Sequence, residues 1–158
     1  MNILLIQPPI QDFYQTSIRT QPIGLAYLAG SLKKQGHEVE ILDCQIDEKR
    51  SIPIPSELSY LKDYYPFHDR SPFKLYSGYY HFGMGWDEIR QKIEDSKMDV
   101  FGISSSFTPY HGETLEIARI IKKWDEKKIV VIGGAHVSCD PEMVLRSPPV
   151  DYVVLGEG

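Results

Sequence analysis

A short loop after one apolar segment carries residue types that could bind a polar ligand. Residues 102–108 read Gly-Ile-Ser-Ser-Ser-Phe-Thr and hold four hydroxyl side chains. Each hydroxyl both donates and accepts hydrogen bonds, which suits a ligand that mixes amide, sugar and phosphate groups. Helix capping and turn formation are the alternative interpretation for any single hydroxyl. The candidate ligand-binding side chains of this loop are Ser104, Ser105, Ser106 and Thr108.

A second loop combines glycines with a histidine. Residues 133–136 read Gly-Gly-Ala-His and follow an apolar run. Glycine permits either an unusual backbone conformation or the close approach of a ligand, and both explanations of Gly133 and Gly134 stay open. His136 could bind a ligand or carry a proton, since imidazole titrates near neutral pH. We favour a structural role for it, in which it bonds backbone or caps the following helix, and the same role for His111.

A third loop follows the last apolar run of the chain. Residues 152–155 lead into the sequence Gly-Glu-Gly at 156–158. Glu157 would lie at the carboxyl end of a strand, where it could contact a ligand or take part in a domain junction. Gly156 and Glu157 are therefore further candidate site residues.

Apolar strands alternate with amphipathic helices along the chain. Residues 2–6 form a continuous apolar run typical of a strand buried on both faces. After Pro22, which can open a helix, apolar residues recur at helical spacing until Gly36 ends the pattern. The same patterns predict further strands at 38–42, 100–104, 129–132 and 152–155, and helices at 86–93, 115–124 and 141–146.

This alternation predicts an α/β fold of the flavodoxin-like (Rossmann-like) type. Right-handed crossovers give a three-layer sandwich, with a five-stranded parallel sheet between helices. We expect the strand order 2-1-3-4-5, which reverses direction between the first and third strands. Ligands of such sheets bind outside the carboxyl ends of the strands at that reversal. The candidate site is therefore built from three loops, at residues 7–9, 104–108 and 133–136.

The first of these loops disfavours the common ligands of the fold. A dinucleotide site needs Gly-x-Gly-x-x-Gly after the first strand, but Gln7, Pro8 and Pro9 stand there. Prolines lack the backbone donors that a phosphate needs. A Walker loop, a hydroxyl-rich flavin-phosphate loop after the first strand and the acidic residues of a phosphorelay receiver are also missing from the sequence.

Composition limits the remaining classes of function. The 158 residues suffice for one domain with its own core. Lys and Arg number 17 against 22 Asp and Glu, without a basic cluster, so we expect no nucleic-acid partner. No apolar run reaches the roughly 18 residues of a membrane span, and no signal peptide is evident, so we expect no membrane partner. Cys44 and Cys139 lie far apart without metal-type spacing, which is typical of a cytoplasmic protein that binds no metal through its own cysteines.

A series of short motifs runs in order along the chain, with a gap at about residues 45–80. They are Gln-Pro-Pro at 7–9, Pro-Ile-Gly-Leu-Ala-Tyr-Leu-Ala at 22–29, Gly-His-Glu-Val at 36–39, Asp43, and the segments 82–89, 102–104, 133–136, 141–142 and 151–158. In order and spacing they resemble the cobalamin-binding domain at the N-terminus of radical S-adenosylmethionine (SAM) enzymes.

The resemblance implies a cobalamin site at the carboxyl ends of the strands. The nucleotide tail would lie between the two loops, bonded by Ser104, Ser106 and Thr108, while Gly133 and Gly134 make room for its benzimidazole. A related cobalamin fold supplies a histidine ligand to cobalt from Asp-x-His-x-x-Gly after its first strand. That motif is absent, so we expect no cobalt ligation by a histidine of this loop. The implied cofactor-binding residues are Gln7, Pro8, Pro9, Ser104, Ser105, Ser106, Thr108, Gly133, Gly134, His136, Gly156 and Glu157.

The resemblance also implies a domain organisation. Residues 1–158 would form one cobalamin-binding domain, followed in the parent protein by a catalytic radical SAM domain as its partner. That catalysis needs three cysteines, spaced C-x-x-x-C-x-x-C, to hold a [4Fe–4S] cluster, and this chain has two cysteines in all. We therefore expect a non-catalytic module of a methyltransferase-type parent, whose SAM and cluster belong to the missing domain and whose substrate is not legible. The alternative is a flavodoxin-like domain that has lost cobalamin and serves as a docking or substrate-positioning element.

The segment at about residues 45–85 interrupts the pattern after the second strand. Ten of the chain's eighteen aromatic residues fall between Tyr60 and Trp86. A loop of this length within a compact domain is unusual unless it is functional or has structure of its own. Our hypothesis is that this insert packs against the missing domain or covers part of the corrinoid. The alternative is a satellite hydrophobic cluster folded over the sheet.

Overall fold

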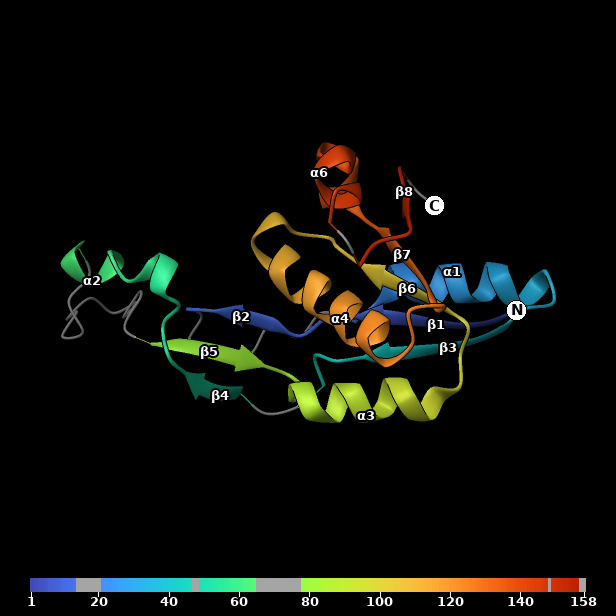
Figure 1. Cartoon of the computed structure of the whole chain (residues 1–158), viewed down its shortest axis with the longest axis horizontal. Coiled ribbons are helices and arrows are strands. Elements are labelled where there is room, and N and C mark those ends of the chain that lie inside the picture. The colour runs from blue at the N-terminus through green and yellow to red at the C-terminus, as the bar shows by residue number, and fades with distance from the viewer. Residues whose placement is uncertain (14–20, 47–48, 65–77, 148, 157–158) are drawn as a thin grey trace.

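A five-stranded parallel sheet forms the centre of the protein (Figure 1). The computed structural model describes residues 1–13, 21–46, 49–64, 78–147 and 149–156. The strands lie in the order β3-β1-β6-β7-β8, which reads 2-1-3-4-5 when only the strands of this sheet are counted along the chain. The α/β class with a parallel sheet is therefore confirmed. The strands are β1 (Asn2–Gln7), β3 (Glu38–Asp43), β6 (Val100–Ser104), β7 (Ile129–Gly133) and β8 (Tyr152–Val154).

Helix α1 (Ile23–Lys34) covers one face of β1 and β3. Its buried residues Leu25 and Ala29 are four apart, so they share one side of the helix. They pack in a small cluster with Ile3, Leu5 and Val39 of the sheet. The helix ends where Gly36 adopts a positive φ of 84°, a conformation that favours glycine.

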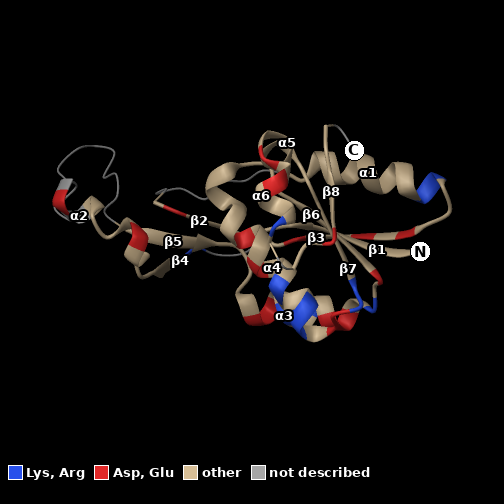
Figure 2. Ribbon diagram, turned by 45° about the horizontal axis from the view of Figure 1, so that its top comes forward, with Lys and Arg blue, Asp and Glu red and all other residues tan. Residues whose placement is uncertain are grey.

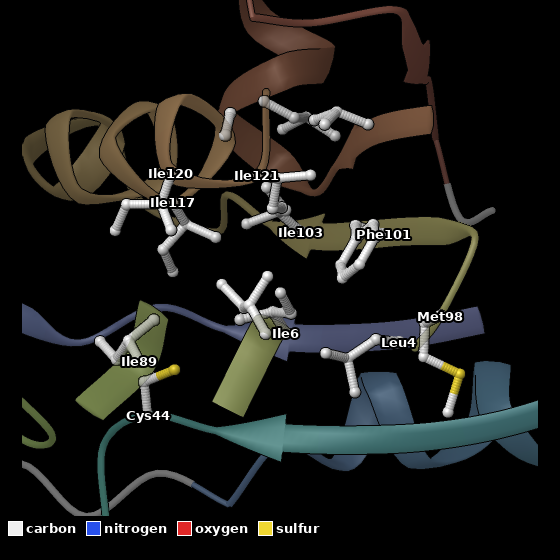
Figure 3. Close-up of a cluster of buried hydrophobic side chains, with 14 of the residues drawn as sticks. Leu4, Ile6, Cys44, Ile89, Met98, Phe101, Ile103, Ile117, Ile120 and Ile121 are labelled. Carbon is white, nitrogen blue, oxygen red and sulfur yellow. The ribbon is translucent and has the colours of Figure 1, made fainter. Parts of the chain in front are cut away.

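Helices α3 (Trp86–Ser96) and α4 (His111–Trp124) cover the other face. Their fully buried isoleucines again recur every four residues, as Ile89 with Ile93 and Ile117 with Ile121. Figure 3 shows Ile89, Ile117 and Ile121 among the side chains of this buried cluster. They meet the alternate residues of β1 and β6, namely Leu4, Ile6, Phe101 and Ile103.

Two short helices follow β7, where the sequence predicted one. They are α5 (Ala135–Cys139) and α6 (Pro141–Leu145). Asp140 separates them and caps α6, because its Oδ1 accepts a hydrogen bond from the backbone N–H of Met143 at 3.1 Å. The expected helix at 141–146 is therefore present, and α5 is an addition.

A second, antiparallel sheet extends beyond the carboxyl ends of β1 and β3 (Figure 1). It joins β2 (Ile10–Asp12), β5 (Tyr79–Phe82) and β4 (Lys49–Ile52) in the order β2-β5-β4. The insert between β4 and β5 also holds a 3₁₀ turn, η1 (Ser56–Leu58), and helix α2 (Leu61–Tyr64). Part of the insert is thus a structured extension of the carboxyl edge. The aromatic residues at 65–77 lie outside the described residues, so the hypothesis about them stays a prediction.

Hydrogen bonds hold this extension to the main domain. The hydroxyl of Tyr110, just before α4, donates to Asp12 Oδ2 at 2.6 Å. Within the small sheet, the hydroxyl of Tyr79 donates to the carbonyl of Gln11 at 3.2 Å, and Gln11 Nε2 lies 3.2 Å from His81 Nδ1. These bonds fix β2 beside the first turn of α4.

Candidate functional site

A cavity of about 280 Å³ opens at the carboxyl edge of the main sheet, where β1 and β6 end. It is bounded by the loop after β1, by the residue two beyond β3, by the hydroxyl loop and by the start of α4. No lining residue is acidic, basic or a histidine, so the cavity surface is neutral, with amide and hydroxyl groups among apolar ones. The lining residues are Gln7, Pro8, Pro9, Ile10, Gln45, Ser104, Ser105, Ser106, Phe107, Pro109, Tyr110 and Thr114.

The structure brings together half of the candidate residues at this cavity: Gln7, Pro8, Pro9, Ser104, Ser105 and Ser106. Thr108, Gly133, Gly134, His136 and Gly156 do not line it. Glu157 lies outside the described residues. That these residues bind a cofactor stays a prediction, because proximity to a cavity is not contact with a ligand.

The sequence analysis missed the contribution of α4 and of Gln45. The helix begins at His111, earlier than the predicted 115, so Tyr110 and Thr114 reach the carboxyl edge one turn apart. The i, i+4 spacing of Tyr110 and Thr114, just before the apolar stripe of the helix, could have indicated that both lie on one side of its first turn. Gln45 had no such sign, and its Nε2 donates to the carbonyl of Pro8 at 2.9 Å.

Ser105 ties the hydroxyl loop to the glycine loop. Its backbone N–H donates to the carbonyl of Gly133 at 2.7 Å, and its own carbonyl accepts from the N–H of His136 at 3.1 Å. Its side chain is 2% exposed, with Oγ 3.5 Å from His111 Nδ1. Ser105 therefore acts within the protein, whereas Ser104 and the exposed Ser106 bond each other through their hydroxyls at 3.1 Å and face the cavity.

The two glycines of the second loop differ in backbone conformation and in what an added side chain would meet. Gly134 has φ 120° and ψ 177°, a region that residues with side chains rarely enter. A Cβ on Gly134 would lie 2.6 Å from the carbonyl oxygen of Ser105, so the neighbouring main chain, and not free space, lies where its side chain would be. A Cβ on Gly133 would meet only Val154, at an ordinary 3.6 Å. Of the two, Gly133 alone could carry a Cβ without a collision.

The rings of His111 and His136 pack against each other behind the hydroxyl loop, tilted by 51°. Their ring centroids are 4.4 Å apart, and His136 is 4% exposed with its Nδ1 3.1 Å from the hydroxyl of Thr108. Among the described residues, neither Nε2 atom has a hydrogen-bond partner. The side-chain partner of His136 is therefore a hydroxyl, where the sequence had suggested a backbone bond or a helix cap, and a structural role for His136 stays a prediction.

A buried carboxyl group, missed by the sequence analysis, lies between α4 and β2. Glu113 is 8% exposed, and burial, with a smaller contribution from the charge of Asp12, raises its pKa to about 7. Hydrogen bonds from the backbone N–H groups of Glu113 and Gln11 oppose that rise. Burial and these two carboxylates also raise the pKa of Tyr79 to about 12. Glu113 lies in the first turn of α4, where exposed acidic residues are common. The residues around it in the sequence therefore do not indicate that it is buried.

The two cysteines differ in their surroundings. Both are free thiols, with Cys44 buried and Cys139 exposed. Burial, followed by the charge of Asp43, raises the pKa of Cys44 far above its ordinary value, which disfavours the nucleophilic thiolate. Within the described ranges, no three His, Cys, Asp or Glu residues gather closely enough to hold a metal ion. None of the described helices combines the length and apolarity needed to cross a membrane.

Residues 77–158 match the family described as the B12 binding domain, which is just over half of the chain. The chain belongs to the B12-binding domain family. The flavodoxin-like arrangement of five parallel strands agrees with this assignment.

Two curated methyltransferases are similar to this B12-binding domain over its whole length. Cytidylyl-2-hydroxyethylphosphonate methyltransferase from Streptomyces wedmorensis is 29% identical over 99% of this chain and 26% of its own length. An uncharacterized methyltransferase from Pyrococcus horikoshii is 27% identical over 100% of this chain and 27% of its own. Among solved structures, a chain from the complex of histidine kinase ThkA with response regulator protein TrrA aligns with TM-score 0.45 and 13% identity, over 99% of this chain and 86% of that one. The domain spans about a quarter of the length of the curated relatives it matches.

The carboxyl edge of the B12-binding domain fits part of a corrinoid. Ligand pockets usually enclose about 300–1,000 Å³, so a cavity of about 280 Å³ would hold a portion of so large a cofactor. The neutral lining suits the amide side chains of a corrin ring, which donate and accept hydrogen bonds without charge. Ser104 and Ser106 offer hydroxyls at the cavity.

We expect His111 to titrate below its ordinary pKa of 6.5. Burial is the main cause, and the neighbouring His136 and Arg119 lower the pKa further. Because the unfolded chain then binds the extra proton more readily, the stability from neutral His111 is present above pH 6.5 and is lost as pH falls through 6.5 toward the folded-state pKa. Following imidazole signals by nuclear magnetic resonance against pH, with a His111→Gln variant for assignment, checks this. A midpoint for His111 at or above 6.5 would contradict the burial described here.

Proposed function

We propose that this domain is the cobalamin-binding module of a longer methyltransferase. The observation that carries the proposal is the neutral cavity lined by hydroxyls and amides at the carboxyl edge, in a chain of the B12-binding family. Bound as methylcobalamin, the cofactor would supply the methyl group that such an enzyme transfers. The domain's own task is to bind the corrinoid, to orient it and to limit access of water to one side of it.

Particular residues take particular parts in that binding. Ser104 and Ser106 bond polar groups of the corrinoid or its nucleotide tail, since their hydroxyls lie together at the cavity. Gln7, at the end of β1, approaches the cofactor's lower face. Gly133 gives room beside the tail, whereas Gly134 acts indirectly by letting its loop pack on Ser105.

Cobalt receives no histidine ligand from the loop after β1. Residues 7–21 contain no histidine. His111 and His136 lie behind the hydroxyl loop, where their Nδ1 atoms contact Ser105 and Thr108. We therefore expect the bound cofactor to keep the spectrum of a corrinoid without a histidine ligand.

We further propose that the parent is a radical SAM enzyme. The motif order of the chain supports this, and the much greater length of the two related methyltransferases leaves ample room for a catalytic domain. Full-length protein prepared without oxygen is expected to contain about four iron and four sulfide per chain. Protein that binds cobalamin but contains no iron would reject the radical SAM parent and leave the cobalamin module intact.

Replacing Ser106 tests the cobalamin site. Ser106→Trp fills the cavity from an exposed position, so we expect cobalamin affinity to fall at least about ten-fold. Ser106→Ala removes a single hydroxyl and is expected to weaken binding only about two- to ten-fold. The measurement is equilibrium dialysis against hydroxocobalamin.

The matched control is Ser31→Trp, an exposed serine on α1 outside the cavity lining. It should leave affinity unchanged. Equal affinities for Ser106→Trp and Ser31→Trp would reject this cavity as the site. Absence of binding by the unsubstituted chain would favour a docking or substrate-positioning domain without cofactor.

A further inference from the structure

Among the described residues, no helix covers one face of the sheet half formed by β6, β7 and β8. In the parallel register Gly102 pairs with Val131 and Val131 with Tyr152. Next to this row, Ser104 pairs with Gly133 and Gly133 with Val154. Paired residues in a parallel sheet share a face, so these two rows lie side by side on one surface.

This surface is apolar and exposed. Ile129, Tyr152 and Val154 are 38%, 60% and 37% exposed, whereas Val130 and Ile132, which point to the opposite face, are 0% exposed. Figure 2 shows no charged residue along β6 or β8. A surface that belonged to solvent would carry polar residues at these alternate positions.

The known helices do not cover it. On this face α1 packs on β1 and β3, through Leu25 and Ala29. The helices that follow β6 and β7 lie on the other face, where Ile117, Val137 and Val144 share a core with Phe101. Sheets made only of parallel strands are normally covered on both faces. The β6–β8 half therefore lacks one layer.

We propose that an apolar helix from the segment of the same polypeptide that follows residue 158 covers this face. The inference rests on the proposed function, since it requires a longer parent protein. Both related methyltransferases are about four times as long as the region they share with this chain. The last element of the described chain is β8, the edge strand that carries part of the uncovered face (Figure 1).

Chain direction favours the same segment. The connections from β6 to β7 and from β7 to β8 both lead toward the β8 edge of the sheet. Because they are right-handed, they cross the same face of the sheet. A right-handed return from the edge strand β8 toward the centre must run over the opposite face, the one that carries α1.

Hydroxyl-radical footprinting of the full-length, unsubstituted protein tests this. Tyr152 and Tyr27 of α1 are both largely exposed in the domain, at 60% and 78%. If the helix covers the face, Tyr152 should be oxidised at least about five times more slowly than Tyr27 in the full-length protein. Equal oxidation of the two tyrosines would overturn the proposal.

Two further conditions of the footprinting experiment identify other molecules that could cover this face. Protection that disappears on dilution would assign the face to a second copy of the chain, and protection that appears only with added cobalamin would assign it to the cofactor. A natural polypeptide that ends near residue 158 would also overturn the inference. Protection without any cobalamin binding would reject the cofactor proposal while supporting the covering helix.

Discussion

A Gly134→Ala substitution is expected to lower the free energy of unfolding by about 3 kcal/mol or more. Alanine is strained at φ 120°, and its Cβ would lie 2.6 Å from the carbonyl oxygen of Ser105. Relief requires the glycine loop to move away from Ser105, which breaks the hydrogen bonds from Ser105 to Gly133 and from His136 to Ser105. For a domain of this size the midpoint of thermal unfolding should fall by roughly 6–12 °C. Cobalamin affinity should fall with it, because Ser105, which the glycine loop holds in place, belongs to the loop that lines the cavity.

The control for this variant is Gly36→Ala. Gly36 also has positive φ, 84°, but a Cβ there would meet nothing within 4 Å. The control therefore isolates the conformational strain, about 1 kcal/mol, from the collision with main chain. Denaturant titrations of the two variants should differ clearly. Equal losses of stability would mean that the loops at 104–108 and 133–136 are not packed as described.

Glu113→Gln is expected to stabilise the protein at alkaline pH. The pKa of Glu113 is about 7 in the folded protein against an ordinary value of 4.5, so the folded state binds the proton more tightly. Its contribution is fully present below pH 4.5 and is lost as pH rises through 4.5 to 7. A glutamine keeps a hydrogen-bonding oxygen but never ionises. At pH 8 the variant should exceed the original chain by about 1–3 kcal/mol, and the gain should vanish near pH 4.

Urea titrations at pH 4.5, 6 and 8 measure this pH dependence. Glu116→Gln on the same helix is the control, since Glu116 forms only a surface ion pair with Arg119 at 3.0 Å. Its effect should stay within about 0.5 kcal/mol. A pH-independent effect of Glu113→Gln would contradict a buried, protonated carboxyl between α4 and β2. The effect opposes that of His111, which loses stability on acidification.

The main sheet was predictable because its strands are short, continuous apolar runs. Residues 2–6 are buried from both sides over most of their length, and residues 129–132 are apolar at every position, so neither sequence shows polar alternation. The helices were predictable where isoleucines recur at four-residue spacing, as at Ile89 and Ile93. Once strand order is inferred, the carboxyl edge follows, and this is why the loops at 7–9 and 104–106 meet at one cavity.

The second sheet and the junction beneath it were not predictable in this way. β2 is three residues long and follows two prolines, so it lacks a readable period. Its place is fixed by contacts between distant residues, such as the bond between Tyr110 and Asp12. The burial of Glu113 arises from the same long-range packing. Likewise, only the structure shows that strain and main-chain contact account for Gly134, whereas a Cβ at Gly133 would meet no collision.

Cobalamin binding by the purified chain is the most direct test of the proposed module. Hydroxocobalamin is titrated into the unsubstituted protein while the visible spectrum is recorded, and the mixture is then passed over a gel-filtration column. We expect a saturating spectral change at one corrinoid per chain, half complete at about 10 μM or below, with the cofactor eluting alongside the protein. An unchanged spectrum with complete separation of protein and cofactor, for chain shown to be folded, would contradict cobalamin binding by this domain.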